Sequence, residues 1–158
     1  MPGLPTALDP EAGARLDAYL QAHIPLVRAM QARVAGCDET GVALSAPLAP
    51  NINHEGSAFG GSLASLATLA CWGLVWLGLE PTRGTHIVVG TSQIDYLRPV
   101  TDTLLAHCPW PESSVLAGLH KTLARGRKAR ITLQAQVRQQ QTLCASFSGD
   151  FVAYRDAP

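Results

Sequence analysis

The feature that most constrains the fold is an uncharged stretch that runs from Ala58 to Leu79. It is long enough to cross a bilayer, which needs about 20 residues. However, neither end carries the adjacent Lys or Arg typical of membrane-spanning helices, and the stretch is interrupted by small and polar residues. A helix that is apolar on all sides and lies outside a membrane must be wrapped by the rest of the chain. We therefore expect a buried central helix over residues 60–77 and no membrane span. The interrupting residues are Gly60, Gly61, Ser62, Ser65, Thr68, Gly73 and Gly78.

A polar loop leads directly into this helix, from Asn51 to the Gly60-Gly61 pair. The first backbone N–H groups of a helix have no partner within the helix, so they can hold an anion or polarise a carbonyl. The loop also supplies two Asn, a His and a Glu. This junction is the best candidate for a functional site.

The composition narrows the possible functions. A length of 158 residues, with a formal net charge of +0, predicts a single domain over residues 1–158 that binds neither nucleic acid nor an anionic membrane. Residues 1–8 are expected to be a flexible N-terminus. The four cysteines form no CxxC pair, which favours free thiols in the cytoplasm, and the histidines have no metal-ligand spacing. A charged fraction of 15% is low, which hints at an oligomer.

The N-terminal part predicts a helix followed by a hairpin. Asp9, Pro10 and Glu11 form a typical helix start, with Asp9 as N-cap, and Pro25 ends the helix after His23. Partial alternation predicts a strand over residues 26–35. A second strand over residues 42–46 follows a turn, so the two are expected to pair as a hairpin.

The C-terminal half reads as strands. Residues 85–97 are rich in β-branched residues, residues 103–108 form a shorter segment, and residues 128–138 alternate strictly between apolar and polar, a pattern that residues 143–153 repeat. Residues 113–124 fit either a helix or a strand with a loop, and a short helix is slightly favoured. Together these segments predict an α+β fold, with a curved antiparallel sheet of five to six strands around one long central helix.

The central helix has one mixed face. At 100° per residue, Ser65, Thr68, Trp72 and Trp76 fall within one sector of about 80°. Two hydroxyl groups near the helix start therefore share a face with two large rings further along.

Three landmarks in this order resemble the hotdog-fold thioesterase superfamily, most closely the YiiD C-terminal type. They are the loop and helix start Asn51–Leu63, the segment Ile94–Val100, and the basic turn Arg125-Gly126-Arg127. The resemblance covers roughly residues 20–155. It implies a hotdog fold, a homodimer or dimer of dimers with sheets joined edge to edge, and an acyl-CoA or acyl-carrier thioester bound at the subunit interface. It implies no metal and no cofactor beyond the CoA of the substrate.

The chain departs from one branch of this superfamily. Thioesterases of the phenylacetate pathway carry His-Gly-Gly and a catalytic Asp on the helix, whereas here Phe59 stands at the His position and Thr68 at the Asp position. Residues 60–79 contain no acid, so the base that activates or positions water in that branch is missing.

Thioester hydrolysis needs a donor for the developing oxyanion and a group that aims water. The N–H groups of Gly60 and Gly61 are candidates for the first role, although the glycines could instead only let helix and sheet approach. Asn53 and His54 are candidates for the second role, with loop-fixing hydrogen bonds as the alternative. Ser65 and Thr68 could hold water or bond back to helix carbonyls.

The basic turn is the candidate site for the phosphates of CoA, with Arg125, Arg127 and Lys128 as its ligands. Equally, these residues could form only a solvated turn that binds no phosphate. The leading hypothesis is a thioesterase. The alternatives are a non-catalytic acyl-CoA-binding module, and a hotdog dehydratase or hydratase that would use His54 with Glu55 or Asp95.

Overall fold

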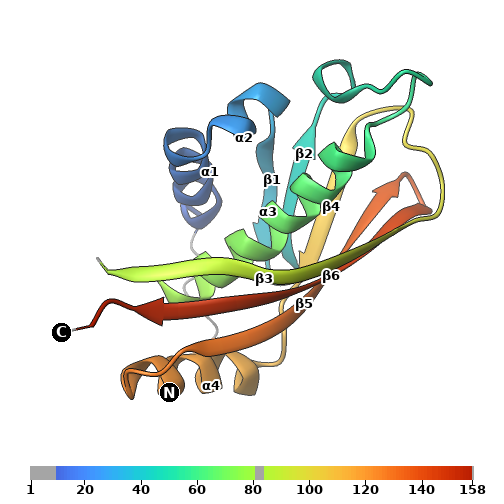
Figure 1. Ribbon diagram of the computed structural model, residues 1–158. Helices are drawn as coiled ribbons and strands as arrows, with labels where there is room; N and C mark the ends of the chain where they lie inside the picture. The colour runs from blue at the N-terminus through green and yellow to red at the C-terminus, as the bar shows by residue number, and fades with distance from the viewer. Residues whose placement is uncertain (1–9, 81–83, 158) are drawn as a thin grey trace.

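A computed structural model describes residues 10–80 and 84–157. One antiparallel six-stranded sheet, in the order β1-β2-β4-β5-β6-β3, curves around the long helix α3 (Gly60–Leu79), as Figure 1 shows. The predicted α+β hotdog architecture is therefore confirmed. The predicted flexibility of residues 1–8 and the N-cap role of Asp9 lie outside the described residues. The strands are β1 (Arg33–Asp38), β2 (Gly41–Ala46), β3 (Thr85–Tyr96), β4 (Leu104–Pro109), β5 (Ala129–Gln139) and β6 (Thr142–Arg155), and the other helices are α1 (Ala12–His23), α2 (Pro25–Met30), the 3-10 turn η2 (Ala49–Asn51) and α4 (Ser113–Ala124).

Most of α3 is buried against the sheet and the neighbouring helices. Leu66, Cys71 and Leu74 are fully buried, and Leu16 of α1 packs against Gly73 of α3. By length and composition α3 could cross a membrane, but 67% of the apolar 18-residue segment that meets this criterion is buried inside the fold. That burial is what a core helix requires, and it accounts for a helix without charge.

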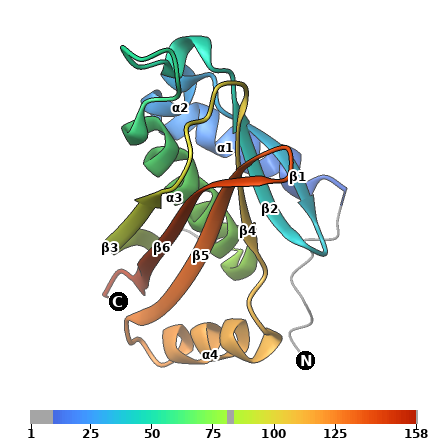
Figure 2. The same ribbon diagram turned by 90° about the vertical axis from the view of Figure 1, so that its right-hand side faces the viewer.

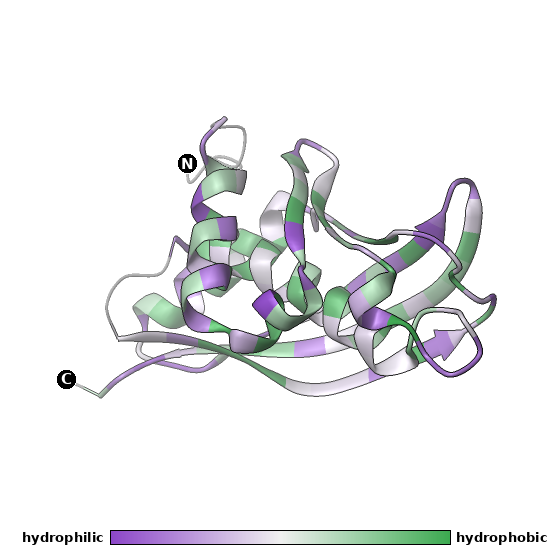
Figure 3. Cartoon of the chain, turned by 90° about the horizontal axis from the view of Figure 1, so that it is seen from above, coloured by the Kyte–Doolittle hydropathy of each residue, from purple (hydrophilic) through white to green (hydrophobic). Residues whose placement is uncertain are grey.

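The strict alternation of residues 128–138 corresponds to β5. Its apolar residues face α3, while the residues between them are exposed on the other face of the sheet. Residues 113–124 form the helix α4, the favoured reading, and His120 Nε2 lies 2.9 Å from the carbonyl oxygen of Gly78 at the end of α3. Figure 3 shows hydrophilic residues interrupting α1 and gathering at turns between strands, away from the apolar layer.

The strand predicted over residues 26–35 is wrong in its first part. Pro25 opens the short helix α2, and only residues 33–35 belong to a strand, because β1 begins at Arg33. Proline is well suited to a first helical position, where its missing N–H is not needed. The apolar residues that suggested alternation include Val27 and Met30, which are three apart and are both buried on one side of α2. The predicted pairing of the hairpin itself is confirmed, between β1 and β2.

Asn51 fixes the loop that precedes α3. Its side chain is 2% exposed, and its Nδ2 donates to the carbonyl oxygens of Met30 (2.9 Å) and Pro47 (2.8 Å). Its own carbonyl oxygen accepts the N–H of Phe59 at 2.7 Å. The side chain of Asn51 therefore joins the end of α2 to the segment after β2, and its backbone carbonyl holds the residue before α3, so this one residue helps to set where α3 begins.

We expect Asn51→Ala to lower the free energy of unfolding by about 2 to 4 kcal/mol, because it removes two hydrogen bonds and leaves two carbonyl groups without a donor. Urea denaturation followed by circular dichroism measures this change. Asn53→Ala is the matched control, since Asn53 lies in an adjacent, more exposed loop, and should lower it by less than about 1 kcal/mol. Equal losses in both variants would contradict a bracing role for Asn51.

Candidate functional site

The start of α3 presents two free donors. The N–H groups of Ser62 and Leu63 both turn back to the carbonyl oxygen of Phe59, at 2.9 and 3.2 Å. The N–H groups of Gly60 and Gly61 donate to no acceptor among the described residues. Because the helix dipole adds partial positive charge at this end, the two N–H groups form a favourable position for an oxyanion.

Two aromatic rings explain why both residues are glycine. A Cβ at position 60 would lie 3.2 Å from the ring of Tyr96, and one at position 61 would lie 2.3 Å from the ring of Phe59. The Tyr96 hydroxyl also donates to the carbonyl oxygen of Gly60 at 3.0 Å. The rings therefore occupy the space that side chains would fill, and they flank the two N–H groups.

These rings belong to a larger exposed apolar surface, which we call the helix-start surface. It consists of Ile52, Phe59, Tyr96 and Leu97, each at least half exposed. The residues come from the loop before α3 and from the end of β3, and Ile52 is joined to Ala58 by an isolated bridge. Apolar side chains gathered at a polar helix start are typical of a surface that binds a ligand or another chain.

Asn53 and His54 lie in the short loop closed by that bridge. Asn53 Oδ1 accepts the N–H groups of Glu55 (2.8 Å) and Ser57 (3.1 Å), which corresponds to the loop-fixing alternative. His54 is at the tip with its side chain 86% exposed, and its Nε2 lies 3.2 Å from Glu55 Oε1. No recorded contact joins either residue to Gly60 or Gly61 within the described part of the chain.

Ser65 and Thr68 lie on the partly exposed face of α3 with Trp72 and Trp76. Their hydroxyl groups donate back to helix carbonyls, Ser65 to Gly61 and Thr68 to Ala64, both at 2.8 Å. The hydroxyl protons are therefore used within the helix. The oxygen lone pairs remain able to accept a hydrogen bond from water.

The basic turn lies far from the start of α3 within one chain. Arg125, Arg127 and Lys128 are exposed between α4 and β5, and Figures 1 and 2 both place this turn at the opposite end of the fold from the start of α3. Lys128 Nζ lies 5.6 Å from the centroid of the Tyr154 ring. A single chain therefore does not bring the basic turn and the helix start together.

The Cys71 thiol is poorly suited to act as a nucleophile. The hydrogen bond with Cys108 and burial both raise the pKa of this thiol, which keeps it protonated. None of the four cysteines is in a disulfide bond. In the described ranges, no three His, Cys, Asp or Glu side chains are grouped so that they could hold a metal ion.

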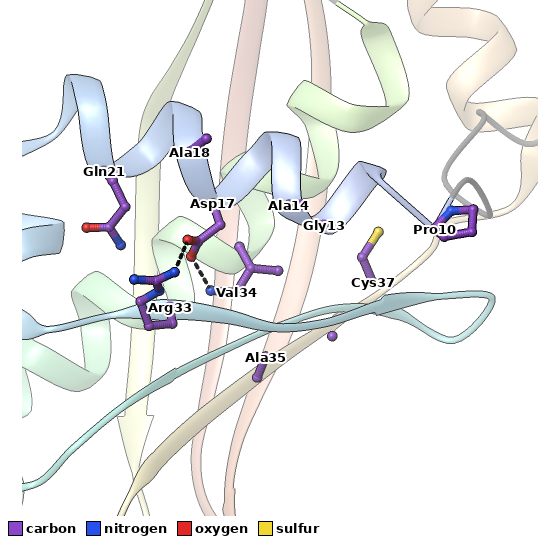
Figure 4. A pocket seen from close by; sticks show the side chains of 11 residues that line it. Pro10, Gly13, Ala14, Asp17, Ala18, Gln21, Arg33, Val34, Ala35 and Cys37 are labelled. Atoms are coloured by element: carbon purple, nitrogen blue, oxygen red, sulfur yellow. Dashed lines mark hydrogen bonds and ion pairs between the residues drawn. The ribbon is translucent and has the colours of Figure 1, made fainter.

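A cavity of about 670 Å³ lies elsewhere, between α1 and β1 (Figure 4). Asp17 points into it but is already engaged, since its carboxylate pairs with Arg33 at 2.8 Å and accepts the N–H of Val34 at 2.8 Å. The remaining lining is largely small and apolar. This cavity contains none of the predicted site residues.

Two residues important to the geometry were absent from the predicted site, Asn51 and Tyr96. Both stood within the segments that carry the family resemblance, so that resemblance was the available signal. Their roles depend on long-range contacts, from Asn51 to Met30 and from Tyr96 to Gly60, which periodicity along the chain does not reveal.

Comparison with known proteins agrees with this arrangement. The family model YiiD_C, described as "Putative thioesterase (yiiD_Cterm)", matches residues 13–155. A "putative thioesterase" from Shewanella oneidensis is 34% identical, with a TM-score of 0.81, over 91% of this chain and 98% of that one. A protein of unknown function from Chlorobaculum tepidum is 29% identical, with a TM-score of 0.86, over 97% and 98%.

A thioesterase from Haemophilus influenzae has the same fold at 15% identity, with a TM-score of 0.67, over 90% of both chains. The family match spans the loop, the helix start, β3 and the basic turn. The chain therefore belongs to the YiiD_C family of hotdog-fold thioesterases.

Proposed function

We propose that the protein hydrolyses an acyl-CoA or acyl-carrier thioester at the start of α3, at an interface between two copies of the chain. The observation that carries this proposal is the pair of free N–H groups on Gly60 and Gly61, flanked by the rings of Phe59 and Tyr96. We also infer a cytoplasmic location, because four cysteines outside any disulfide bond suit a reducing compartment.

In this mechanism, water attacks the thioester carbonyl carbon, and the carbonyl oxygen gains negative charge. The N–H groups of Gly60 and Gly61 donate to that oxyanion, and the C–S bond then breaks to release the thiol and the carboxylic acid. No cofactor is needed. His54, close to Glu55, is the group that accepts the proton of water, while the oxygen of Ser65 or Thr68 accepts a hydrogen bond that positions the water.

The exposed edge of β3 supports pairing with a second copy. β3 pairs with β6 on one edge, and its residues from Ile87 to Ile94 carry no charge. Proteins usually protect a free edge with charges, proline or short length, whereas this edge is 12 residues long, has no proline and carries its one acidic residue, Asp95, only near its end. Antiparallel pairing of two β3 strands would form a continuous sheet with two-fold symmetry.

The side chains of β3 suit such pairing. Ile87 and Ile94 are both partly buried against the core on the α3 side, whereas His86 and Asp95 are exposed. With a two-fold axis between Gly90 and Thr91, Ile87 would meet Ile94 of the second copy and His86 would meet Asp95. Like side chains would therefore continue the apolar layer, and on the other side the imidazole of His86 would face the carboxylate of Asp95.

A second copy would also bring the basic turn to the site. Thr85 at the start of β3 pairs with Arg155, and Ala129, which follows the basic turn, pairs with Ala153. Tyr96 at the other end of β3 contacts Gly60. Antiparallel pairing places the Thr85 end of one copy beside the Tyr96 end of the other, so each basic turn would approach the other copy's helix start.

A non-catalytic acyl-CoA-binding module is the second candidate. It is favoured by the lack of an acid on α3 and by the hydroxyl protons of Ser65 and Thr68, which are used within the helix. Binding of CoA without thiol release from any acyl-CoA would support it. Hydration of an enoyl-CoA would instead indicate a hydratase.

Gly61→Val should lower the turnover number for thiol release by about 100- to 1000-fold, because the side chain obstructs access to the oxyanion donors. His54→Ala should lower it by about 100-fold through loss of the proton acceptor. Thiol release from acyl-CoAs of different acyl groups measures both. Gly118→Val is the control, since a Cβ there meets no atom within 4 Å. Unchanged turnover in a folded Gly61→Val variant would refute the oxyanion role.

Val89→Lys should convert a dimer into monomers and abolish thiol release, because it adds a charge to the free edge near the proposed two-fold axis. Analytical ultracentrifugation measures the mass in solution. Val115→Lys on α4 is a matched control, since Val89 and Val115 are 43% and 41% exposed. A wild-type monomer that is active, or a Val89→Lys dimer, would contradict pairing through β3.

The double variant Arg125→Ala/Arg127→Ala should weaken CoA binding by about tenfold, through lost charge-assisted hydrogen bonds to phosphate at an exposed turn. Titration calorimetry at fixed salt measures the affinity. Pantetheine, which lacks the nucleotide phosphates, is the control ligand and should bind both proteins equally. If CoA affinity is unchanged, the phosphates bind elsewhere.

A further inference from the structure

The partly exposed face of α3 forms a single row that begins at the free N–H groups. Gly61, Ser65, Thr68, Trp72 and Trp76 follow one another at helical spacing, and all are partly exposed, whereas most other residues of α3 are buried. The side chains of this row are small near the helix start and large at the far end. We call it the α3 row.

Trp72 is fixed in place from two sides. Its Nε1 donates to the carbonyl oxygen of Ile87 in β3 at 2.8 Å. The ring of Tyr19 in α1 stacks on it, with ring centroids 5.8 Å apart, and also lies 5.0 Å from Trp76. A residue of β3 and a residue of α1 therefore both contact Trp72, and together they fix the position of its indole.

The first part of the row suits an apolar chain. The hydroxyl protons of Ser65 and Thr68 are used by Gly61 and Ala64, so no unpaired donor faces outward there. An apolar chain that covers Thr68 would leave no donor unpaired, while the oxygen of Ser65, nearer the helix start, stays available for the water of the proposed mechanism. The row is also continuous with the donors of Gly60 and Gly61, where the thioester carbonyl would bind under the proposed function.

We propose that the acyl chain of the substrate lies along the α3 row and that Trp72, held by Ile87 and Tyr19, forms the end wall that limits its length. The inference rests on the proposed function for the position of the carbonyl. Gly61 and Trp72 are 11 residues apart, or about 16 Å along the helix axis, and side chains lean toward the helix start, which shortens the space. The expected substrates carry short to medium acyl chains, and long fatty acyl chains are excluded.

The test measures binding, so it does not depend on turnover. The probes are CoA ketone analogues in which a methylene replaces the thioester sulfur, with butyryl, hexanoyl, octanoyl, decanoyl and palmitoyl chains. For the wild type, affinity should rise by about fourfold per methylene until the chain meets Trp72, and then stop rising. Trp72→Leu should extend this rise to longer chains and improve palmitoyl affinity at least tenfold relative to hexanoyl.

A second variant should shorten the space for the acyl chain instead of lengthening it. Thr68→Trp places an indole four residues nearer the start, about 6 Å along the axis, and should stop the rise at a shorter chain. The control is Trp110→Leu, because Trp110 is also partly exposed and its Nε1 also donates to a strand carbonyl, that of Asp38 at 2.7 Å. Its length profile should match the wild type.

Length profiles that are the same in the wild type, Trp72→Leu and Thr68→Trp would overturn the inference. So would tight binding of the palmitoyl analogue by the wild type. Thiol release from butyryl- and hexanoyl-CoA by the wild type tests the proposed function separately. If thiol release is absent but the length profiles shift as expected, Trp72 still limits chain length and the protein is a binding module rather than a thioesterase.

Discussion

The structure depends on the burial of one helix that has no charged residue. Because α3 cannot face water on most of its surface, the sheet must curve around it, and α1 must cover part of what the sheet leaves open. Burial is incomplete along a single row and at the first turn. The parts of α3 that remain accessible are therefore its unpaired N–H groups and a strip of small residues that ends in tryptophan. Under the proposed function, the same packing that stabilises the fold thus defines where a thioester can reach the helix.

Two further surfaces near β3 are exposed and have no partner within the described part of the chain. The free edge of β3 exposes backbone groups and valines, and the helix-start surface exposes aromatic and aliphatic side chains at the end of the same strand. Both are costly in water, one through an unprotected strand edge and the other through exposed apolar area. A single event, antiparallel association of two chains, would cover the edge and bring a basic turn to each helix start. The exposure of these neighbouring surfaces is thus consistent with one interface that contains the site.

Sequence reasoning succeeded where periodicity is strong and failed where a proline was ambiguous. The uncharged stretch, the alternation of β5 and the β-branched run of β3 each predicted an element of the right type, because burial on one or both faces leaves a regular pattern. The strand predicted over residues 26–35 began too early, because Pro25 starts α2 as readily as it ends α1, and the six residues of α2 are too few for a clear period. The loop carried the family resemblance, but the brace from Asn51 and the contact from Tyr96 join residues far apart in sequence, so no local pattern could reveal them.

The absence of an acid on α3 bears on how the site can work. In the related branch with an Asp at this position, the helix itself supplies the group that acts on water. Here the hydroxyl group of Thr68 instead donates a hydrogen bond to the carbonyl oxygen of Ala64. What α3 retains is electrostatic, a pair of N–H groups at the positive end of a long buried helix. Under the proposed function, stabilisation of the oxyanion then carries a larger share of catalysis, and the proton acceptor comes from outside α3. His54 suits the role of proton acceptor, because it lies on an exposed loop outside α3. From the tip of this loop it could reach a carbonyl bound at an interface, although no contact within the described part of one chain joins it to the helix start.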